Sequence, residues 1–427
     1  MRLLRTGNRG PSVQLLQLAL NRAGYGALQQ DGIFGTATAD AVRRFQKDRG
    51  LSPDAVVGER THRALLPWYT GYLTHRIEWG DTLYLLALRY GTSVHALRVA
   101  NPNAREENLP VGGTLTVPLP FAVVPTEIDW FAGLTALCVR GLTARYPFIR
   151  GGSIGKSVMG RPLHSLTLGT GGSRVLYNAA HHANEWITTP LLLRFAEELA
   201  AAYADRGSVF GVSAESILDR TTLCLIPSVD PDGTELVTGE LSGGAYYENA
   251  RRIAARYPRY PFPAGWKANV RGVDLNLQYP AGWEQARENK YAIGIVSPAP
   301  ADFVGTAPLT EPEARALYEF TRSFSPALIL ALHTQGEVIY WRYLFNEPPG
   351  SREIAEHFAA VSGYAVEDTP FISGFAGYKD WFIQDFDRPG YTIESGLGTN
   401  PLPLAQFDTL YRRTLGILAL GTVLTQK

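Results

Sequence analysis

Apolar positions return with a helical period near the start of the chain. Within residues 13–20, apolar side chains fall on one helical face, and the glycines of residues 24–26 end that helix. A turn at residues 31–35 precedes a second helical pattern, for which Thr36 is the expected N-cap. The same sequence of turn and helix begins again at Gly58. These patterns predict a small all-α unit.

A different pattern follows. Apolar and polar residues alternate over residues 74–79, which predicts a short strand. A helix is expected to start at Asp81 or Thr82, and a second helix is expected to end before Asn101. Residues 112–118 read as a turn and a closing strand. The pattern therefore predicts a βααβ unit.

The rest of the chain, residues 126–427, alternates apolar strands with helical stretches. The expected strands cover residues 174–180, 222–229, 327–332 and 391–394, and the expected helices cover residues 190–203, 311–322, 351–361 and 404–425. Such alternation predicts one α/β domain, in which a mixed sheet is flanked by helices on both faces.

Composition excludes several classes of protein. The chain has 427 residues, with 40 Lys plus Arg and 40 Asp plus Glu, and this balance argues against a nucleic-acid binder or a polybasic membrane-surface protein. No apolar run is long enough for a membrane span, and the charged start carries no apolar signal-peptide core. The two cysteines, Cys138 and Cys224, exclude a cysteine zinc cluster, and two buried thiols are expected rather than a disulfide.

Two resemblances concern the N-terminal units. The string Gly-x-x-Val-x-x-Leu-Gln…Asp-Gly-x-Phe-Gly-x-x-Thr within residues 1–68 resembles a three-helix peptidoglycan-binding domain. The string Trp-Gly-Asp-Thr-Leu…Tyr-Gly-Thr-Ser…Ala-Asn within residues 72–119 resembles a LysM domain, a module that binds glycans containing N-acetylglucosamine. The expected partners are therefore the glycan and stem peptides of peptidoglycan.

Three strand ends carry candidate chemistry in the third unit. His182 and Glu185 follow one apolar strand at a spacing that points both side chains the same way. His333 ends a second strand, and Glu394 ends a third. A buried histidine of the core is the plainer interpretation of His333, and an ion pair with Arg388 is the plainer interpretation of Glu394.

Together these residues form a coherent set. Two histidines and one glutamate leave a fourth position on a zinc ion open for water. A second glutamate that does not bind the metal can take a proton from that water and return it to a leaving amine. We therefore expect one Zn²⁺, with His182, Glu185 and His333 as its ligands and Glu394 as the general base.

The third unit resembles the zinc metallocarboxypeptidases of the carboxypeptidase A family. The matching strings are His-x-x-Glu-Trp, Asp-Pro-Asp-Gly, Gly-Val-Asp-Leu-Asn, His-Thr and Thr-Ile-Glu. The resemblance implies the same zinc ligands and the same base, and it makes Asn276 a contact for the substrate's carboxylate.

The sequence also departs from that family. The family's reader of the peptide terminus is an Arg directly after Asn276, where this chain has Leu277, so a free C-terminal carboxylate is not expected to be required. Arg271 is the expected oxyanion-stabilising residue, with a surface arginine as the alternative. Tyr378 is a candidate for the family's substrate-contacting tyrosine, or else a packed aromatic. Lys379 stands near the specificity position, where it favours a substrate carboxylate unless it is merely solvated.

The combined layout resembles the bacterial γ-D-glutamyl-L-diamino-acid endopeptidases of this family. The expected activity is zinc-dependent hydrolysis of the γ-D-glutamyl–meso-diaminopimelate bond, in a protein associated with the cell wall or with a compartment of the sporulating cell. Two alternatives are a wall-anchored carboxypeptidase that acts on ordinary peptides, and a binding protein with an inactive hydrolase fold. The preference between diaminopimelate and lysine and the oligomeric state are left open by the sequence.

Overall fold

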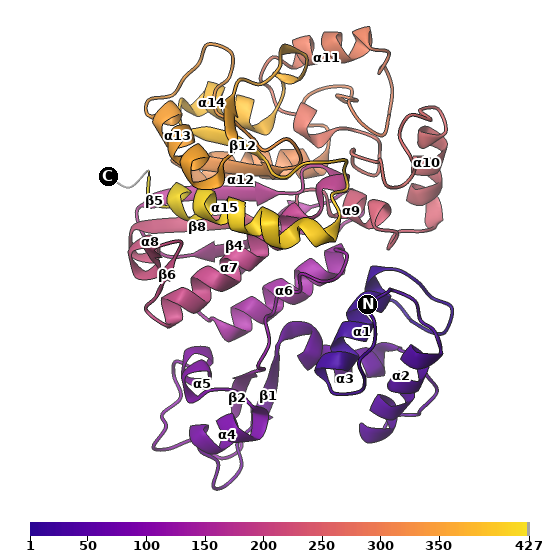
Figure 1. The fold of residues 1–427 in the computed structure, drawn as a ribbon, viewed down its shortest axis with the longest axis vertical. Helices are drawn as coiled ribbons and strands as arrows, with labels where there is room; N and C mark the ends of the chain where they lie inside the picture. Colours follow the sequence, from indigo (N-terminus) through magenta and orange to yellow (C-terminus); the bar gives the residue numbers. More distant parts are fainter. Residues whose placement is uncertain (425–427) are drawn as a thin grey trace. The chain divides into compact units, whose positions relative to one another are not determined.

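The structure, a computed structural model, describes residues 1–424 and divides into two compact units (Figure 1). The first unit contains Met1–Asp129 and Ala136–Arg150. The second contains Trp130–Thr135 and the chain from Gly151 onward. Residues 136–150 fall in the first unit in this division, and the domain boundary expected at residue 126 stays a prediction.

The first module consists of three helices joined by two turns of the same design. The helices are α1 (Pro11–Arg22), α2 (Thr36–Asp48) and α3 (Glu59–Thr70). The buried Gln17 amide donates to Asp31 Oδ1 (2.8 Å) and to the carbonyl oxygen two residues further on (3.1 Å). The buried Gln46 amide donates to Asp54 Oδ1 (2.9 Å) and again to the carbonyl two residues further on (3.1 Å). One hydrogen-bond pattern thus fixes both turns.

The second module has the expected βααβ order. Its elements are β1 (Tyr72–Arg76), α4 (Leu83–Tyr90), α5 (Val94–Ala100) and β2 (Thr114–Pro118), and the two strands pair antiparallel. Thr82 is the N-cap of α4, since its side chain accepts a hydrogen bond from Leu85 N. Gly91 ends the helix in the left-handed conformation, with φ 65°.

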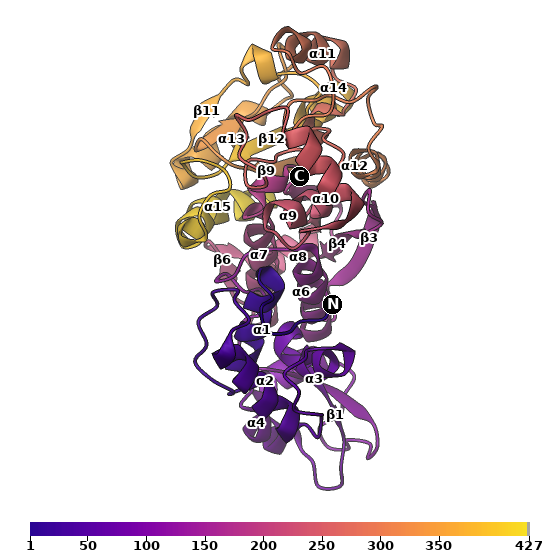
Figure 2. The ribbon, with the colours of Figure 1, turned by 90° about the vertical axis from the view of Figure 1, so that its right-hand side faces the viewer.

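A mixed sheet of eight strands organises the second unit (Figure 2). Its strands, in the order β11-β10-β12-β9-β5-β8-β4-β3, are β11 (Ala365–Glu367), β10 (Val338–Tyr340), β12 (Gly390–Glu394), β9 (Leu328–His333), β5 (Ser173–Ala179), β8 (Thr221–Ile226), β4 (Pro162–Leu168) and β3 (Arg150–Lys156). The four middle strands run parallel. Their carboxyl ends therefore meet at one edge of the sheet.

Helices cover both faces of this sheet, and its middle strands are therefore buried on both sides. On one face, Tyr177 of β5 donates a hydrogen bond to the carbonyl of Leu418 in α15 (2.9 Å). On the other face, Leu176 and Ile329 share a core with Leu317 of α12 and Trp381 of α14. The helices of this unit are α7 (Thr188–Ala204), α8 (Ala214–Arg220), α9 (Pro231–Val237), α10 (Gly244–Ala254), α11 (Trp283–Ala292), α12 (Pro312–Phe324), α13 (Ser351–Ser362), α14 (Tyr378–Phe386) and α15 (Phe407–Gly421). Helix α6 (Ala132–Arg145) begins in this unit, and its residues from Ala136 onward belong to the first.

Short elements complete the unit. These are the 3₁₀ helices η1 (Ala183–Glu185), η2 (Leu275–Leu277), η3 (Phe371–Ser373) and η4 (Leu404–Gln406), and a separate hairpin of β6 (Ser208–Val209) and β7 (Val212–Ser213).

Two local expectations differ from the structure. Thr36 is not the N-cap of α2 but its first residue, because the extended Gly35 occupies the cap position. The helix expected from residue 404 begins as the 3₁₀ helix η4, and α15 itself starts at Phe407 and ends at Gly421. Residue 425, the expected end of that helix, lies outside the described residues.

One expectation from composition is confirmed, because Cys138 and Cys224 are both buried thiols that form no disulfide. Among residues 1–424, no helix combines the length and the apolar character that crossing a membrane requires.

Candidate functional site

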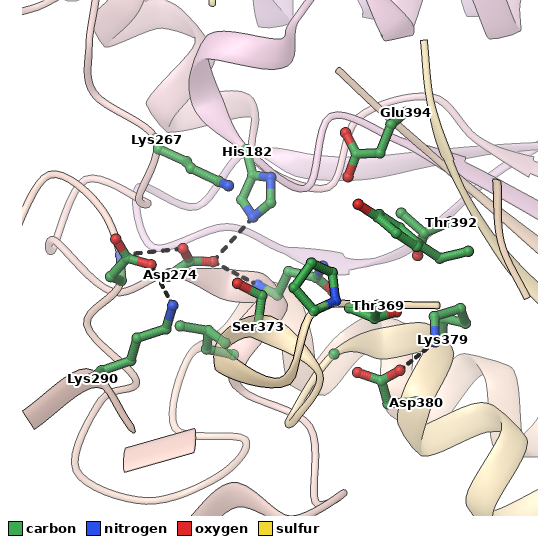
Figure 3. Close-up of a pocket in the computed structure, with 16 residues that line it drawn as sticks. His182, Lys267, Asp274, Lys290, Thr369, Ser373, Lys379, Asp380, Thr392 and Glu394 are labelled. Carbon is green, nitrogen blue, oxygen red and sulfur yellow. Dashed lines mark hydrogen bonds and ion pairs between the residues drawn. The ribbon is translucent and has the colours of Figure 1, made fainter. Parts of the chain in front are cut away.

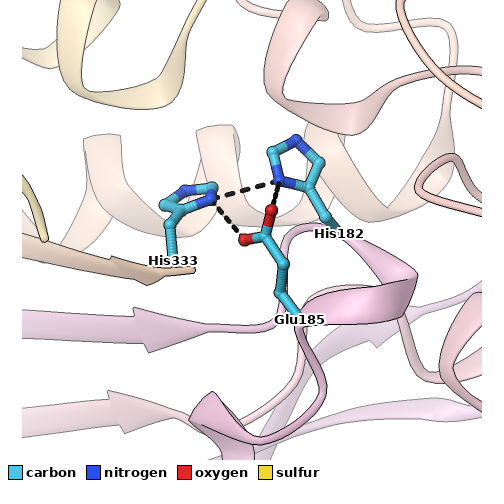
Figure 4. A group of neighbouring side chains, drawn as sticks. All are labelled: His182, Glu185 and His333. Atoms are coloured by element: carbon cyan, nitrogen blue, oxygen red, sulfur yellow. Dashed lines mark hydrogen bonds and ion pairs between the residues drawn. The ribbon is translucent and has the colours of Figure 1, made fainter. Parts of the chain in front are cut away.

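Three buried side chains meet at the carboxyl edge of the sheet (Figure 4). His182 Nδ1 lies 2.9 Å from Glu185 Oε1, and His333 Nδ1 lies 2.9 Å from Glu185 Oε2. The two Nδ1 atoms are 3.2 Å apart. Two imidazole nitrogens and a carboxylate that face one point form a set of donor atoms suited to a metal ion.

The turn after β5 holds two of these ligands in place. It opens at Ala180, a non-glycine residue with a φ of 47°, whose N–H donates to Thr188 Oγ1 (2.9 Å). The Thr188 hydroxyl donates in turn to the carbonyl of Glu185 (2.8 Å). The N–H of Thr334 donates to Glu185 Oε2 (3.2 Å), which ties this turn to the end of β9.

Asp274 orients the first histidine. Its Oδ1 lies 3.1 Å from His182 Nε2, on the far side of the imidazole from Glu185. This contact places the ring proton on Nε2 and leaves the Nδ1 lone pair directed at the cluster. Burial alone would lower the pKa of His182, but the charges of Glu185 and Asp274 outweigh it and raise the pKa to about 9. The histidine thus lies in an anionic environment that also favours a cation.

Glu394 ends β12 directly opposite His333 in the parallel pair β12–β9. Burial, reinforced by the negative charge of Glu185, raises the pKa of Glu394 to about 8. The ion pair considered for it does not form, because Arg388 donates to the carbonyl groups of Ser325 (3.1 Å) and Pro326 (2.9 Å). Glu394 is thus a half-buried carboxyl group whose proton exchanges near neutral pH.

A cavity of about 210 Å³ lies beside the cluster and is lined by charges of both signs (Figure 3). Lys290 Nζ lies 2.7 Å from Asp302 Oδ1, and Lys379 is ion-paired with Asp380. The full lining is His182, Lys267, Asp274, Asn276, Leu277, Lys290, Asp302, Tyr340, Thr369, Pro370, Ser373, Gly377, Lys379, Asp380, Thr392 and Glu394.

The structure brings Asn276 and Lys379 to this cavity, but not Arg271 or Tyr378. Arg271 does not line the cavity; its guanidinium is half-exposed and lies 3.5 Å from Glu311 Oε2. Tyr378 is fully buried in the core, where its hydroxyl bonds to Thr321 Oγ1 (2.8 Å), as the packed-aromatic alternative described. The Lys379 ammonium donates to the carbonyl of Arg342 (2.6 Å) and is buried rather than solvated.

Sequence reasoning overlooked three residues of this site. Lys267 lines the cavity with its Nζ 3.9 Å from Glu185 Oε1, and it stands four positions before the arginine chosen from the same string. Asp274 precedes Asn276 by two residues within the Gly-Val-Asp-Leu-Asn string that resembles the family. Nothing in the local sequence around Asp302 pointed to its pairing with Lys290.

Comparisons with known proteins agree with this geometry. A family model described as zinc carboxypeptidase matches residues 138–399, a peptidoglycan-binding domain model matches residues 9–65, and a LysM model matches residues 75–118.

Two relatives cover most of the chain. Gamma-D-glutamyl-L-diamino acid endopeptidase 1 of Lysinibacillus sphaericus is 45% identical over 286 residues, which is 67% of this chain and 70% of that protein. The uncharacterized protein YqgT of Bacillus subtilis (strain 168) is 41% identical over 276 residues, or 64% of this chain and 72% of that protein.

A solved structure of bovine thrombin-activatable fibrinolysis inhibitor shares the fold, with a TM-score of 0.54 and 17% sequence identity. The match covers 70% of this chain and 98% of that one.

Proposed function

The chain belongs to the zinc carboxypeptidase family and is a zinc metallopeptidase, and on this premise we propose that it cleaves the γ-D-glutamyl–meso-diaminopimelate bond of peptidoglycan stem peptides. The observation that carries the proposal is the cavity lining. Leu277 stands where a reader of a free peptide terminus is expected, while Lys379 and Asp380 offer one charge of each sign. The distal centre of diaminopimelate carries one ammonium and one carboxylate group, which matches such a pair.

The three clustered residues hold the metal. His182, Glu185 and His333 supply two nitrogens and a carboxylate within 4.8 Å of one another, a set that fits one zinc ion. A bound zinc ion supplies Lewis acidity, which polarises the scissile carbonyl and makes a nearby water molecule more acidic. Asp274 keeps the His182 ring in the orientation that this task requires.

The protein's own groups then move the proton and hold the developing charge. The Glu394 carboxylate accepts a proton from the attacking water and returns it to the leaving nitrogen of diaminopimelate. Lys267 lies beside the cluster and stabilises the negative charge that develops on the carbonyl oxygen, the role that the sequence had suggested for Arg271. Asn276 and Lys379 hold carboxylate oxygens of the leaving diamino acid.

The N-terminal modules supply attachment to the wall. The chain carries a peptidoglycan-binding domain and a LysM domain ahead of the catalytic residues. Binding of these modules to the polymer raises the concentration of stem peptides near the catalytic site.

The direct test is digestion of L-Ala-γ-D-Glu-meso-diaminopimelate, with and without a further D-Ala, followed by mass spectrometry. We expect the wild type to release L-Ala-D-Glu from both peptides, and Glu394→Gln to lose at least about a hundredfold in rate. Glu353→Gln, at an exposed glutamate of α13, is the matched control and keeps full activity. Bound zinc, measured by elemental analysis, stays with Glu394→Gln and is lost from His333→Ala.

Other outcomes contradict the proposal in distinct ways. Trimming of ordinary peptides without cleavage of the stem peptides would indicate the wall-anchored carboxypeptidase. Zinc binding without hydrolysis of either substrate class would indicate the binding protein. If a stem peptide with lysine in place of diaminopimelate is cleaved as fast as the diaminopimelate peptide, then Lys379 and Asp380 do not have the role assigned to them.

A further inference from the structure

A dense group of arginines lies on helix α10 and on the turn that follows it. Arg251, Arg252, Arg256 and Arg259 are all exposed and fall within nine residues of a chain whose formal net charge is zero. We refer to these four residues as the α10 arginine surface. Such a local excess of one charge attracts polymers of the opposite charge.

Three of these arginines keep their charge available. Arg251 is ion-paired with Glu248 (2.8 Å). Within residues 1–424, no ion pair joins the other three to a carboxylate. Arg252 contacts the Asn249 side chain (3.4 Å), and Arg256 donates to a backbone carbonyl. The Arg259 guanidinium lies 4.9 Å from the centre of the ring of the next residue.

The surface is continuous with a wall of the catalytic cavity through one segment, residues 297–302. Arg256 donates to the carbonyl of Pro298 (2.9 Å), and the Tyr260 hydroxyl donates to Asp302 Oδ2 (3.4 Å). The inner side of the segment meets the site, because the N–H of Lys267 donates to the carbonyl of Pro300 (2.8 Å). Asp302 itself lines the cavity beside Lys290.

This segment places the surface on a defined side of the site. In Figure 3, Lys267 and Lys290 lie on one side of the cavity, and Lys379 and Asp380 lie on the other. The α10 arginine surface therefore extends outward from the Lys290 side, away from the pair that we assign to the leaving diamino acid.

We propose that the α10 arginine surface binds carboxylates of the peptidoglycan polymer next to the stem peptide being cleaved, an inference that rests on the proposed function. Because the D-Glu of each stem is linked through its γ-carboxyl group, its α-carboxylate is free. Guanidinium groups bind carboxylates through two parallel hydrogen bonds. Each exposed pair contributes little alone, so the effect comes from several pairs acting together. The surface therefore distinguishes the polymer from a single soluble stem peptide.

The test compares two substrates in the full-length protein. The variant Arg252→Gln/Arg256→Gln/Arg259→Gln is assayed on the soluble tripeptide and on purified insoluble peptidoglycan at about 50 mM and 500 mM salt. We expect unchanged kcat/KM on the tripeptide and a five- to tenfold slower release of products from the polymer at low salt, on the order of what three weak surface contacts supply. High salt screens such contacts and should remove the difference.

The control variant Arg206→Gln/Arg220→Gln/Arg322→Gln removes the same charge at the opposite edge of the sheet. These residues follow or end α7, α8 and α12, whose C-termini lie near the amino ends of the strands. We expect this variant to match the wild type on both substrates.

The double variant Arg252→Gln/Arg259→Gln keeps the hydrogen bond from Arg256 to Pro298. A loss of polymer hydrolysis in this variant therefore comes from the missing charges and not from a disturbed cavity wall. Equal loss of polymer hydrolysis in both triple variants would overturn the proposal. The proposal would also be overturned if neither the triple nor the double variant of the α10 arginine surface lost polymer hydrolysis. Failure of the wild type to cleave the tripeptide would instead contradict the proposed function.

Discussion

The site contains two glutamates, the buried Glu185 and the half-buried Glu394, whose chemistry differs. Burial alone would raise the pKa of Glu185, but the imidazoles of His182 and His333 reverse this effect and hold its pKa well below the usual range. For Glu394, burial and the negative charge of Glu185 outweigh the opposing charges of Lys267 and His182 and raise its pKa to about 8. One carboxylate is therefore fixed as an anionic ligand, and the other is able to exchange a proton near neutral pH.

The assignment of the oxyanion-stabilising residue leads to a prediction at the residue scale. Replacing Lys267 by Gln removes the ammonium group that lines the cavity and lies 3.9 Å from Glu185 Oε1. We expect kcat on the tripeptide to fall about 10²- to 10³-fold, the range found when a single oxyanion-stabilising donor is removed. Arg271→Gln should change kcat by less than about twofold, because its guanidinium lies outside the cavity.

Lys267→Arg and a zinc measurement complete this experiment. The arginine variant keeps a positive charge and should retain more activity than Lys267→Gln. Zinc content shows whether the change has disturbed the neighbouring ligand Glu185. Loss of activity in Arg271→Gln, with full activity in Lys267→Gln, would reverse the two assignments.

The sequence predicted some residues of the site better than others. His182, Glu185, His333 and Glu394 all follow or end buried apolar strands, so the sheet itself determines where they meet. The role of Tyr378 depends on which way one side chain of α14 points, and local spacing does not encode this. Arg271 failed to reach the cavity for a related reason, because a turn separates it from Lys267.

At the scale of elements, α9 and α12 bring buried carboxyl groups together behind the ligand turn. Arg161 pairs with both Asp232 and Glu235, and within residues 1–424 no ion pair joins Glu313 of α12 to a cation. Burial raises the pKa of Glu313 to about 7. In the folded protein this side chain therefore keeps its proton at pH values where the unfolded chain has lost it.

The proton that Glu313 keeps in the folded protein makes the stability of the protein depend on pH. Because the pKa of Glu313 rises on folding, its contribution to stability is full below about pH 4.5 and is lost as the pH rises to about 7. In Glu313→Gln, the decrease in the free energy of unfolding between low and high pH should be smaller than in the wild type by on the order of 3 kcal/mol. Thermal unfolding at pH 5 and pH 8 measures it, and Glu319→Gln, at an exposed site of α12, is the control. Equal pH dependence in the wild type and Glu313→Gln would show that Glu313 is already ionised.

The elements themselves were predictable where a pattern was strong. The four parallel strands in the middle of the sheet are continuous apolar runs, and each was expected. The strands at the two margins were not expected, because β3 is exposed and rich in glycine and β10 has only three residues. A strand at the edge of a sheet buries too little to impose an apolar pattern.

For the whole molecule, attachment and catalysis should be separable. Trp79 of the LysM module is 92% exposed, an unusual position for a large apolar ring and one typical of a binding surface. We expect Trp79→Ala to reduce retention on insoluble peptidoglycan about tenfold while leaving tripeptide hydrolysis unchanged. Leu3→Ala, at another exposed apolar site of the first unit, should leave both unchanged. A loss of tripeptide hydrolysis in Trp79→Ala would show that the module also affects catalysis.

The strand order has a consequence for biosynthesis. Strand β12, which carries Glu394, is made after β10 and β9 but inserts between them. The metal ligands all precede it along the chain, so a nascent polypeptide that ends before β12 possesses every ligand but no general base. Folding of the sheet therefore completes the catalytic centre only at a late stage of translation. A chain that is still on the ribosome thus holds the metal ligands before it holds the carboxyl group that hydrolysis requires.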